Sequence, residues 1–432
     1  MSKFIAKPAF SLAGNLQIPG DKSISHRAIM LGALADGITK ISGFLQGEDV
    51  LSTLKAFAAM GVKIEQNADK VTIYGVGIFG LKRPEKPIDL GNSGTSVRLI
   101  SGILVAQDFD SELIGDASLS KRPMGRVIEP LSKMGALISS SNGKLPLKIT
   151  GGQALNAIDY QLPVASAQVK SCILLAGLYA RGRTCITEPA PTRDHTERML
   201  RGFGQQVNSS GNSICLTGKA KLTPTQIQVP ADISSAAFFM VAASIAKTAD
   251  ITLPAVNINP TRTGIIEILQ LMGAKISLTN QAEIGGELIA DIRICNSKLK
   301  GINIPEALVP LAIDEFPAIF IAAACATGET ILTGAKELRV KESDRIQAMA
   351  DGLEILGIKN SVLADGIKIT GGELQKPSAI IQSHADHRIC MAFAVASARC
   401  QHPIEIADVD NVKTSFPNFV ELANAAGMVI EG

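Results

Sequence analysis

A helix pattern that ends in an apolar residue followed by glycine occurs six times along this 432-residue chain. The glycines come at nearly even intervals, at Gly61, Gly135, Gly204, Gly273, Gly357 and Gly427. Glycine is typical of this position because the residue that closes a helix often adopts a left-handed conformation. A repeat of this length is a subdomain rather than one turn of a solenoid.

A second, more apolar helix pattern precedes each of these helices and begins on polar residues. The starts are Asp21-Lys22-Ser23, Asn92-Ser93-Gly94-Thr95, Ser166-Ala167-Gln168, Asp232-Ile233-Ser234-Ser235, Asp314-Glu315-Phe316-Pro317 and Asp386-His387-Arg388. Short segments with strand character, such as Lys70–Tyr74 and Gly366–Ile369, fill the intervals. Each copy therefore has the order strand, helix, strand, helix, strands, which predicts an α/β (α+β) fold.

The sixth copy ends at Ile430, before its closing strands. The segment Phe4–Ile18 has strand character and no helix of its own, so we expect it to complete the sixth copy. Three copies then belong to residues 21–229, and three to residues 230–432 with 1–20. The sequence thus predicts two domains, the second of them discontinuous, with chain crossings near Gly20 and Val229-Pro230.

The composition of the chain argues against several classes of function. The chain is 46% hydrophobic, carries a net charge of +2, and has 4% aromatic residues and no Trp. It therefore lacks the broad basic field and the stacking platforms of nucleic-acid binders. Its apolar runs are too short to span a bilayer, and the N-terminus has no signal-peptide pattern. We expect a cytoplasmic protein whose seven Cys, which show no paired spacing, are buried thiols.

The segment Pro19–Arg27 places Lys22 and Arg27 at the start of a predicted helix. Cations are disfavoured there because the first turn of a helix carries a partial positive charge. A bound anion would remove the conflict, since helix N-termini, serine hydroxyls, Lys and Arg all favour phosphate. The alternative for one such stretch is a solvated basic helix end.

Cations recur at the other helix starts: Arg98, Arg122, Arg193, Lys341, Arg345, Arg388 and Lys413. Lys341 and Arg345 are four residues apart and would share one face of a helix. Any one of these cations could belong to a surface ion pair. Their common position in a repeated unit instead favours a concentrated positive field for a small, multiply anionic ligand.

Two acids, Asp314 and Glu342, stand beside these cations and could act as general acid or base. The alternatives are an N-cap for Asp314 and a salt bridge for Glu342. His384 and His387 lack further ligands at metal-site spacing, so no metal is expected. The segment Gly75–Gly80 matches a dinucleotide fingerprint, but Pro84 and Pro87 exclude the helix that must follow it, which predicts a turn.

Several motifs together resemble the enolpyruvyl transferase family over essentially the whole chain. They are Pro-Gly-Asp-Lys-Ser-Ile-Ser-His-Arg at 19–27, Gly-Asn-Ser-Gly-Thr-Ser-Val-Arg at 91–98, Lys-Arg-Pro-Met-Gly at 121–125, Arg-Asp-His-Thr-Glu at 193–197, Arg-Val-Lys-Glu-Ser-Asp-Arg at 339–345, Asp-His-Arg at 386–388 and Lys-Thr-Ser-Phe-Pro at 413–417. The resemblance implies two similar domains of three βαβαββ units each, with an active site in the cleft between them.

The resemblance also implies a reaction. The enolpyruvyl group of phosphoenolpyruvate is transferred to the 5-hydroxyl of shikimate 3-phosphate and phosphate is released, a step of chorismate and aromatic amino acid synthesis. It implies no metal or organic cofactor and no nucleic-acid or membrane partner, and we expect a monomer. It further implies inhibition by glyphosate at the phosphoenolpyruvate site, where Gly94 would matter because an added methyl group would project toward the anion.

The resemblance also implies a set of site residues, which we assign to the matching positions of this sequence. Shikimate 3-phosphate contacts are expected at Lys22, Ser23, Arg27, Ser166, Ala167, Gln168, Arg193, Asp314 and Lys341. Phosphoenolpyruvate contacts are expected at Lys22, Gly94, Arg122, Gln168, Arg345, Arg388 and Lys413. Asp314 resembles the base for the 5-hydroxyl, and Glu342, with Lys22, resembles the proton-transfer group at the methylene carbon.

Two departures separate the chain from the commoner bacterial pattern. Ala167 replaces a second serine, and Glu337 stands where an asparagine often binds substrate, so Arg193 is expected to supply a phosphate contact instead. One rival within the family acts on UDP-N-acetylglucosamine, but it carries a catalytic Cys in the loop that here reads Asp116–Arg122 and an Asn after the first Lys. A non-catalytic module that binds phosphorylated metabolites is the other alternative, and the presence of Asp314 and Glu342 argues against it.

Overall fold

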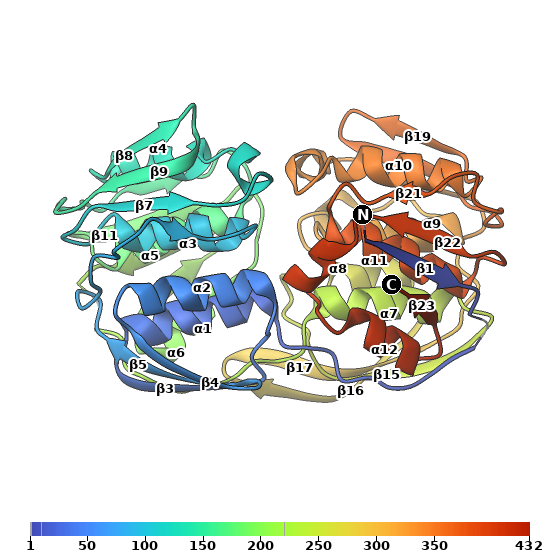
Figure 1. Cartoon of the computed structure of the whole chain (residues 1–432), viewed down its shortest axis with the longest axis horizontal. Coiled ribbons are helices and arrows are strands. Elements are labelled where there is room, and N and C mark those ends of the chain that lie inside the picture. The colour runs from blue at the N-terminus through green and yellow to red at the C-terminus, as the bar shows by residue number, and fades with distance from the viewer. Residues whose placement is uncertain (1, 10, 220) are drawn as a thin grey trace. The chain divides into compact units, whose positions relative to one another are not determined.

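The computed structural model describes residues 2–9, 11–219 and 221–432, and two kinds of helix alternate along the chain (Figure 1). The first kind is apolar and almost wholly buried: α1 (Lys22–Leu34), α3 (Gly94–Leu104), α5 (Ala167–Gly177), α7 (Ile233–Ile245), α9 (Phe316–Ala324) and α11 (His387–Val395). The second kind is amphipathic: α2 (Glu48–Ala59), α4 (Gly125–Lys133), α6 (His195–Gly202), α8 (Gly264–Leu271), α10 (Arg345–Ile355) and α12 (Phe419–Ala425).

Local capping chemistry fixes both ends of these helices. The side chains of Asp21, Ser93, Ser166, Asp232 and Asp386 accept a hydrogen bond from a backbone N–H of the first turn of the helix that follows. All six predicted closing glycines have positive φ, from +74° at Gly357 to +102° at Gly135. The five predicted starts at these capping residues and the six predicted helix ends are therefore confirmed, and so is the predicted turn within Gly75–Gly80, after which no helix follows.

Each copy contributes its strands to a small mixed sheet. In unit 2, defined below, the sheets in spatial order are β14 (Gln226–Gln228), β3 (Asp36–Ser42), β5 (Lys70–Val76) and β4 (Lys63–Asn67); β6 (Ile88–Asp89), β7 (Ser111–Ile114), β9 (Lys144–Thr150) and β8 (Leu137–Ser141); and β10 (Asp159–Gln161), β11 (Arg183–Thr187), β13 (Ser213–Thr217) and β12 (Val207–Ser210). In each, the first pair is parallel and the other pairs are antiparallel.

Unit 1 repeats this strand order, except that one of its sheets has three strands, which pair antiparallel. Its sheets are β2 (Ser11–Asn15), β15 (Thr248–Asn257), β17 (Glu287–Cys295) and β16 (Lys275–Ile284); β18 (Glu329–Leu332), β20 (Gly366–Thr370) and β19 (Asn360–Leu363); and β21 (Ile381–Gln382), β22 (Ile404–Ala407), β1 (Lys3–Lys7) and β23 (Val429–Glu431).

Short 3-10 helices occur in both units, at Leu119–Lys121 (η1), Glu306–Leu308 (η2), Lys336–Val340 (η3), Ala396–Ala398 (η4) and Asp410–Thr414 (η5).

The N-terminal segment serves two copies rather than one. Strand β1 lies between β22 and β23, with Phe4 opposite Ile406 and Ile5 opposite Glu431, so it completes the sixth copy as predicted. Strand β2 instead pairs in parallel with β15, Leu12 lying opposite Ala249, and thereby joins the fourth copy. The prediction that all of Phe4–Ile18 completes the sixth copy is wrong for β2, because its single buried side chain, Leu12, packs in the core beside β15.

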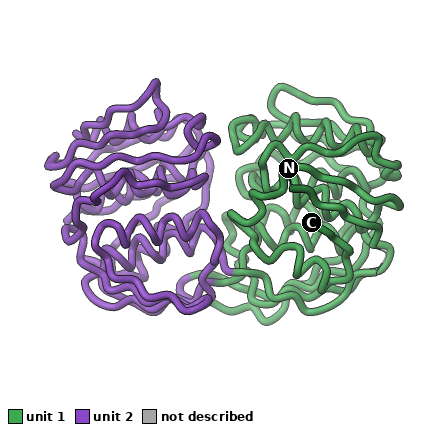
Figure 2. The backbone as a smooth tube through the Cα atoms, in the orientation of Figure 1, with its two compact units in different colours: residues 1–19, 230–283, 287–432 green, residues 20–229, 284–286 purple. Residues whose placement is uncertain are grey.

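The backbone divides into two compact units, each with its own hydrophobic core (Figure 2). Unit 1 contains residues 1–19, 230–283 and 287–432, and unit 2 contains residues 20–229 and 284–286. The division lies next to the crossings expected near Gly20 and Val229-Pro230. That residues 1–20 with 230–432 form one domain and residues 21–229 the other stays a prediction. No helix in the described ranges is long and apolar enough to cross a membrane.

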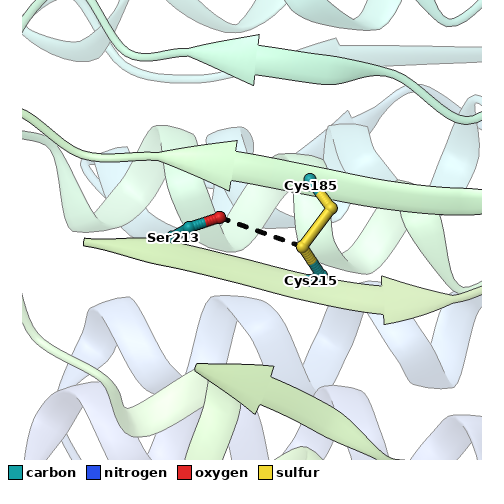
Figure 3. Close-up of a disulfide and its surroundings, with 3 residues drawn as sticks. All are labelled: Cys185, Ser213 and Cys215. Carbon is teal, nitrogen blue, oxygen red and sulfur yellow. Dashed lines mark hydrogen bonds between the residues drawn. A yellow bond between two sulfur atoms is a disulfide. The ribbon is translucent and has the colours of Figure 1, made fainter. Parts of the chain in front are cut away.

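Two of the seven cysteines contradict the expectation of unpaired thiols. Cys185 on β11 lies directly opposite Cys215 on β13, and the two form a disulfide across the antiparallel pair (Figure 3). Sequence spacing did not suggest this pairing because the partners meet only through strand register. The other five, Cys172, Cys295, Cys325, Cys390 and Cys400, are free, and three of these are buried. Burial raises the pKa of the Cys172 thiol to about 12.

Candidate active site

The predicted site residues fall into two sets, one in each unit, and most lie at helix starts. Unit 2 carries Lys22, Ser23, Arg27, Gly94, Arg122, Ser166, Ala167, Gln168 and Arg193. Unit 1 carries Asp314, Lys341, Glu342, Arg345, Arg388 and Lys413. We describe each set within its own unit.

In unit 2, two guanidinium groups flank the glycine that begins α3. A Cβ atom built on Gly94 would lie 3.1 Å from Arg122 Nη1 and 3.3 Å from Arg98 Nη1. Arg98 donates to Gln168 Oε1, and Arg122 donates to Asn92 Oδ1 at 2.6 Å. The absence of a side chain at Gly94 therefore lets both guanidinium groups lie against the backbone. The sequence argument placed an added methyl group toward the ligand, whereas the structure places it against Arg122 and Arg98.

Lys22, the first residue of α1, forms an ion pair with Asp49 in the first turn of α2. One turn further along α1, His26 Nδ1 lies 2.8 Å from Thr53 Oγ1, which in turn lies 2.6 Å from Ser96 Oγ on α3. His26 Nε2 is buried and has no hydrogen-bond partner in the described chain. Burial, together with the charges of Lys22 and Arg27, lowers the pKa of His26 well below its usual value of 6.5. A neutral histidine thus links the start of α1 to the start of α3.

Arg27 is buried more deeply than a substrate contact usually is, at 4% exposure. Its Nε donates to Thr196 Oγ1 at 2.7 Å and its Nη2 donates to Ser171 Oγ at 2.9 Å. It therefore also ties α1 to α5 and α6. Ser23, Ser166, Ala167, Gln168 and Arg193 are all partly exposed, and Ser166 is the N-cap of α5.

In unit 1, Arg345 begins α10 with its side chain 1% exposed, surrounded by three carboxylates. Its Nε donates to Asp386 Oδ2 at 2.9 Å, its Nη2 forms an ion pair with Glu342, and its Nη1 lies 3.4 Å from Asp314 Oδ1. Burial alone would lower the pKa of Arg345, but these three charges outweigh it and raise the pKa above its usual value. A permanently charged guanidinium thus orients both predicted proton-transfer acids.

Two further predicted cations contact Asp314. Lys341 Nζ lies 3.2 Å from Asp314 Oδ1, and Arg388 Nη1 donates to the backbone carbonyl of Asp314 at 2.8 Å. The expectation that Lys341 and Arg345 share a helix face is wrong. Asp344 caps α10 by accepting from Gln347 N, so the helix begins at Arg345, and Lys341 precedes it, directly after η3. Both cations reach the same carboxylate oxygen without sharing a helix.

Lys413 is the exception among the predicted residues. It is exposed on η5, several residues before α12, rather than at the start of that helix. No hydrogen bond or ion pair in the described ranges joins it to Asp314, Glu342 or Arg345. Asp314 also precedes the N-cap of α9, which is Glu315, so the N-cap alternative for Asp314 does not hold. The salt-bridge alternative for Glu342 does hold.

Several side chains that support these sets were not singled out from the sequence. Asp49 holds Lys22, Asp386 holds Arg345, and Glu315, 4% exposed, lies 3.7 Å from Arg262 and 4.0 Å from Arg388. The sequence marked Asp386 only as a helix start and as the first residue of the Asp-His-Arg motif at 386–388. Among the described residues, no group of three or more His, Cys, Asp or Glu side chains could hold a metal ion.

The paired sets of helix starts, one cationic and one with oriented carboxylates, are typical of an enzyme that acts on an anionic substrate. Comparison with known proteins identifies the family. Residues 7–422 match the family model of EPSP synthase (3-phosphoshikimate 1-carboxyvinyltransferase), so the chain belongs to the EPSP synthase family and is a transferase.

Relatives support this over the full length. The chain is 74% identical over 430 residues to the 3-phosphoshikimate 1-carboxyvinyltransferase of Ruthia magnifica subsp. Calyptogena magnifica, covering 100% of this chain and 99% of that protein. It is 72% identical to the protein of that name from Vesicomyosocius okutanii subsp. Calyptogena okutanii (strain HA), with the same coverage. It also resembles the solved structure of EPSP synthase from Acinetobacter baumannii, with a TM-score of 0.88, 57% identity, and coverage of 100% of this chain and 99% of that one.

Proposed function

We propose that the chain transfers the enolpyruvyl group of phosphoenolpyruvate to the 5-hydroxyl of shikimate 3-phosphate, with release of phosphate. The observation that carries this proposal is the setting of Asp314, whose Oδ1 lies 3.2 Å from Lys341 Nζ and 3.4 Å from Arg345 Nη1. Two cations hold the carboxylate in one orientation, as a general base for a hydroxyl requires. The membership of the chain in the EPSP synthase family supports the choice of substrates.

The roles divide as follows. Asp314 takes the proton of the 5-hydroxyl while the hydroxyl oxygen forms a bond to C2 of phosphoenolpyruvate. Glu342, with Lys22, delivers a proton to the methylene carbon. Loss of that proton and cleavage of the bond from C2 to the phosphate oxygen then restore the double bond. The proposed reaction uses no metal or organic cofactor, because arginine side chains can stabilise the developing negative charge.

Binding contacts complete the proposal. Shikimate 3-phosphate is held by Lys22, Ser23, Arg27, Ser166, Ala167, Gln168, Arg193 and Lys341, and phosphoenolpyruvate by Lys22, Gly94, Arg122, Gln168, Arg345, Arg388 and Lys413. Support is strongest for Gly94, Arg122 and Gln168, because Arg122 and Arg98 both lie against Gly94 and Arg98 donates to Gln168. It is weakest for Lys413, which stands outside the unit 1 network. We also propose a monomeric, cytoplasmic enzyme.

The test is phosphate release with phosphoenolpyruvate and each of two acceptors. We expect release with shikimate 3-phosphate and none with UDP-N-acetylglucosamine. Release only with the latter would move the chain to the other branch of the family. Tight binding of both substrates by calorimetry without turnover would indicate a binding module, and would overturn the proposed activity.

A further inference from the structure

A lysine that is not among the predicted ligand contacts is buried inside unit 2. Lys170 on α5 has a side chain only 1% exposed, and its Nζ lies 2.8 Å from Glu188 Oε2, 2.8 Å from Glu197 Oε1 and 3.2 Å from the carbonyl oxygen of Thr192. Three acceptors thus satisfy the three protons of the ammonium group. Such a group is held in one position, because losing any one partner would leave a buried charge incompletely bonded.

The three partners of Lys170 bracket one connection. Glu188 directly follows β11, Thr192 lies near the end of the connection, and Glu197 lies in the first turn of α6. Residues 188–194 between them have no helix or strand of their own. The Thr192 hydroxyl also donates to Glu188, and the Glu188 backbone N–H donates to the carbonyl oxygen of Asn212 at 2.9 Å. One ammonium group therefore fixes both ends of this otherwise irregular segment.

Arg193 follows Thr192 directly, and the cluster reaches Arg27 as well. Ser171, next to Lys170 on α5, and Thr196, next to Glu197 on α6, are the residues that accept from the Arg27 guanidinium. Of two proposed contacts of shikimate 3-phosphate, Arg193 is thus adjacent in sequence to Thr192 of the cluster, and Arg27 is hydrogen-bonded to the sequence neighbours of Lys170 and Glu197. The position of Arg193 depends on how the connection is held, whereas Arg27 is held directly by Ser171 and Thr196.

Stability alone is a poor reason for such a cluster. A buried ion cluster usually contributes little net stability compared with apolar residues of similar volume. Here one cation faces two carboxylates, and Glu197 Oε2 is buried with no hydrogen-bond partner in the described chain. Burial raises the pKa of Glu197, against the opposing effect of Lys170. Burying two carboxylates with one cation therefore costs electrostatic free energy. The cluster is more readily explained by the conformation that it imposes on the connection 188–194.

We propose that Lys170, with Glu188 and Glu197, positions the connection 188–194 so that Arg193 is oriented for the phosphate of shikimate 3-phosphate. Lys170 is a positioning residue and does not touch the substrate. This inference rests on the proposed function, because it takes Arg193 to be a substrate contact.

The experiment is a double-mutant cycle with Lys170→Met and Arg193→Ala, read as separate kinetic constants. We expect each single variant to raise the KM for shikimate 3-phosphate by roughly tenfold to hundredfold, the effect of losing one charge-assisted hydrogen bond. The KM for phosphoenolpyruvate and kcat should change by less than about threefold. The double variant should be no worse than Arg193→Ala, because a residue that acts through another adds nothing once its target is gone.

A matched control is Lys133→Met, which removes an exposed lysine of the same unit that pairs with Glu129 at 2.8 Å. This variant should leave both KM values unchanged. If Lys170→Met does not fold, Thr192→Val carries the same cycle, since it removes only the hydroxyl that donates to Glu188. That milder change should raise the KM for shikimate 3-phosphate by about threefold to tenfold.

The outcomes separate this inference from the function it rests on. An unchanged KM for shikimate 3-phosphate in Lys170→Met, or in Thr192→Val where the first does not fold, overturns the positioning role, and so does an additive double variant. An effect spread equally over kcat and both KM values indicates a merely structural role and also overturns it. If Arg193→Ala has no effect, the assignment of Arg193 in the proposed function fails first. If the wild-type chain releases no phosphate, the proposed function itself fails.

Discussion

The two units are built on the same plan of helices and sheets, yet they hold their arginines differently. In unit 2, Arg98 donates to the Gln168 amide, and Arg122 donates to the Asn92 amide and the Ser118 hydroxyl. In unit 1, Arg345 is bound to three carboxylates. Neutral acceptors orient a guanidinium without cancelling its charge, whereas carboxylates are themselves oriented by the guanidinium that they neutralise.

This difference suggests that the helix starts of the two units have different functions. Unit 2 is suited to holding anionic groups, and we expect changes there to appear mainly in substrate affinity. Unit 1 is suited to placing Asp314 and Glu342 for proton transfer, and we expect changes there to appear mainly in kcat. Three substitutions test this division, beginning with the one of largest expected effect, and a fourth tests the stability of unit 2.

Asp314→Asn should lower kcat by about 10²–10⁴-fold, the usual contribution of a general base, while both KM values stay within a fewfold of wild type. The amide keeps the shape of the side chain but cannot accept the 5-hydroxyl proton. Steady-state phosphate release with each substrate varied in turn measures both constants. Asp351→Asn, an exposed carboxylate on α10 that accepts from Gln347, is the control and should behave as wild type. A loss confined to KM would place Asp314 among binding residues and break the division.

Lys22→Ala tests the one residue that crosses the division between binding and proton transfer, because Lys22 lies in unit 2 but is proposed to take part in proton transfer. Losing its charge-assisted contact with a bound anion should cost about 1.5–3 kcal/mol, a fall of roughly tenfold to hundredfold in kcat/KM. Steady-state kinetics on protein with a normal melting temperature provides the measurement. Near-normal activity in the folded variant would contradict the proposal. A fall in kcat at saturating substrates would show that unit 2 contributes to proton transfer.

Gly94→Ala probes the guanidinium pair of unit 2. The new methyl group would lie 3.1 Å from Arg122 Nη1 and 3.3 Å from Arg98 Nη1, closer than ordinary van der Waals contact, so at least one guanidinium must shift. Overpacking of this kind costs about 1–3 kcal/mol. We expect the KM for phosphoenolpyruvate to rise, and the inhibition constant of glyphosate to rise more, because the longer inhibitor has less room to follow the displaced groups. Equal changes in the two constants would reject this explanation.

His26→Gln concerns stability rather than catalysis and should have the smallest effect. The unfolded chain binds a proton at this histidine near pH 6.5, whereas the folded protein, with the pKa of His26 lowered, binds it only at lower pH. The free energy of unfolding should therefore fall as pH drops below about 6.5, with a slope of at most about 1.4 kcal/mol per pH unit from this group.

Urea unfolding at several pH values between 7 and 5 measures that slope. It should flatten in His26→Gln, whereas His402→Gln, which changes an exposed histidine of unit 1, should alter it less. Equal slopes in wild type and His26→Gln would mean that His26 takes up its proton equally well in the folded protein.

Features set by neighbours in the chain were predictable, and features set by tertiary contact were not. The helix starts at Asp21 and Ser93 and the closing Gly61 depend on local capping chemistry, so sequence alone located them. The residue that begins α10 was missed because the Asp344 cap outweighs the spacing of Lys341 and Arg345.

Long-range partners left no local signal. Asp386 comes to Arg345 from another copy of the repeat, and Glu188 reaches Lys170 from the end of a strand. The place of β2 in the sheet with β15 depends on pairing between residues far apart in sequence. Family resemblance named the residues that would touch substrate, but it carried no information on the side chains that hold them.

The bond between Cys185 and Cys215 closes a covalent ring, with a sequence separation of 30 between its two ends. Glu188, Thr192, Arg193 and all of α6 lie within this ring. In the unfolded chain this cross-link restricts the conformations of the segment that contains Glu188 and Glu197, and so lowers the entropy that the segment loses on folding. The ring also means that a single backbone cleavage between Glu188 and Glu197 leaves one molecule, not two fragments.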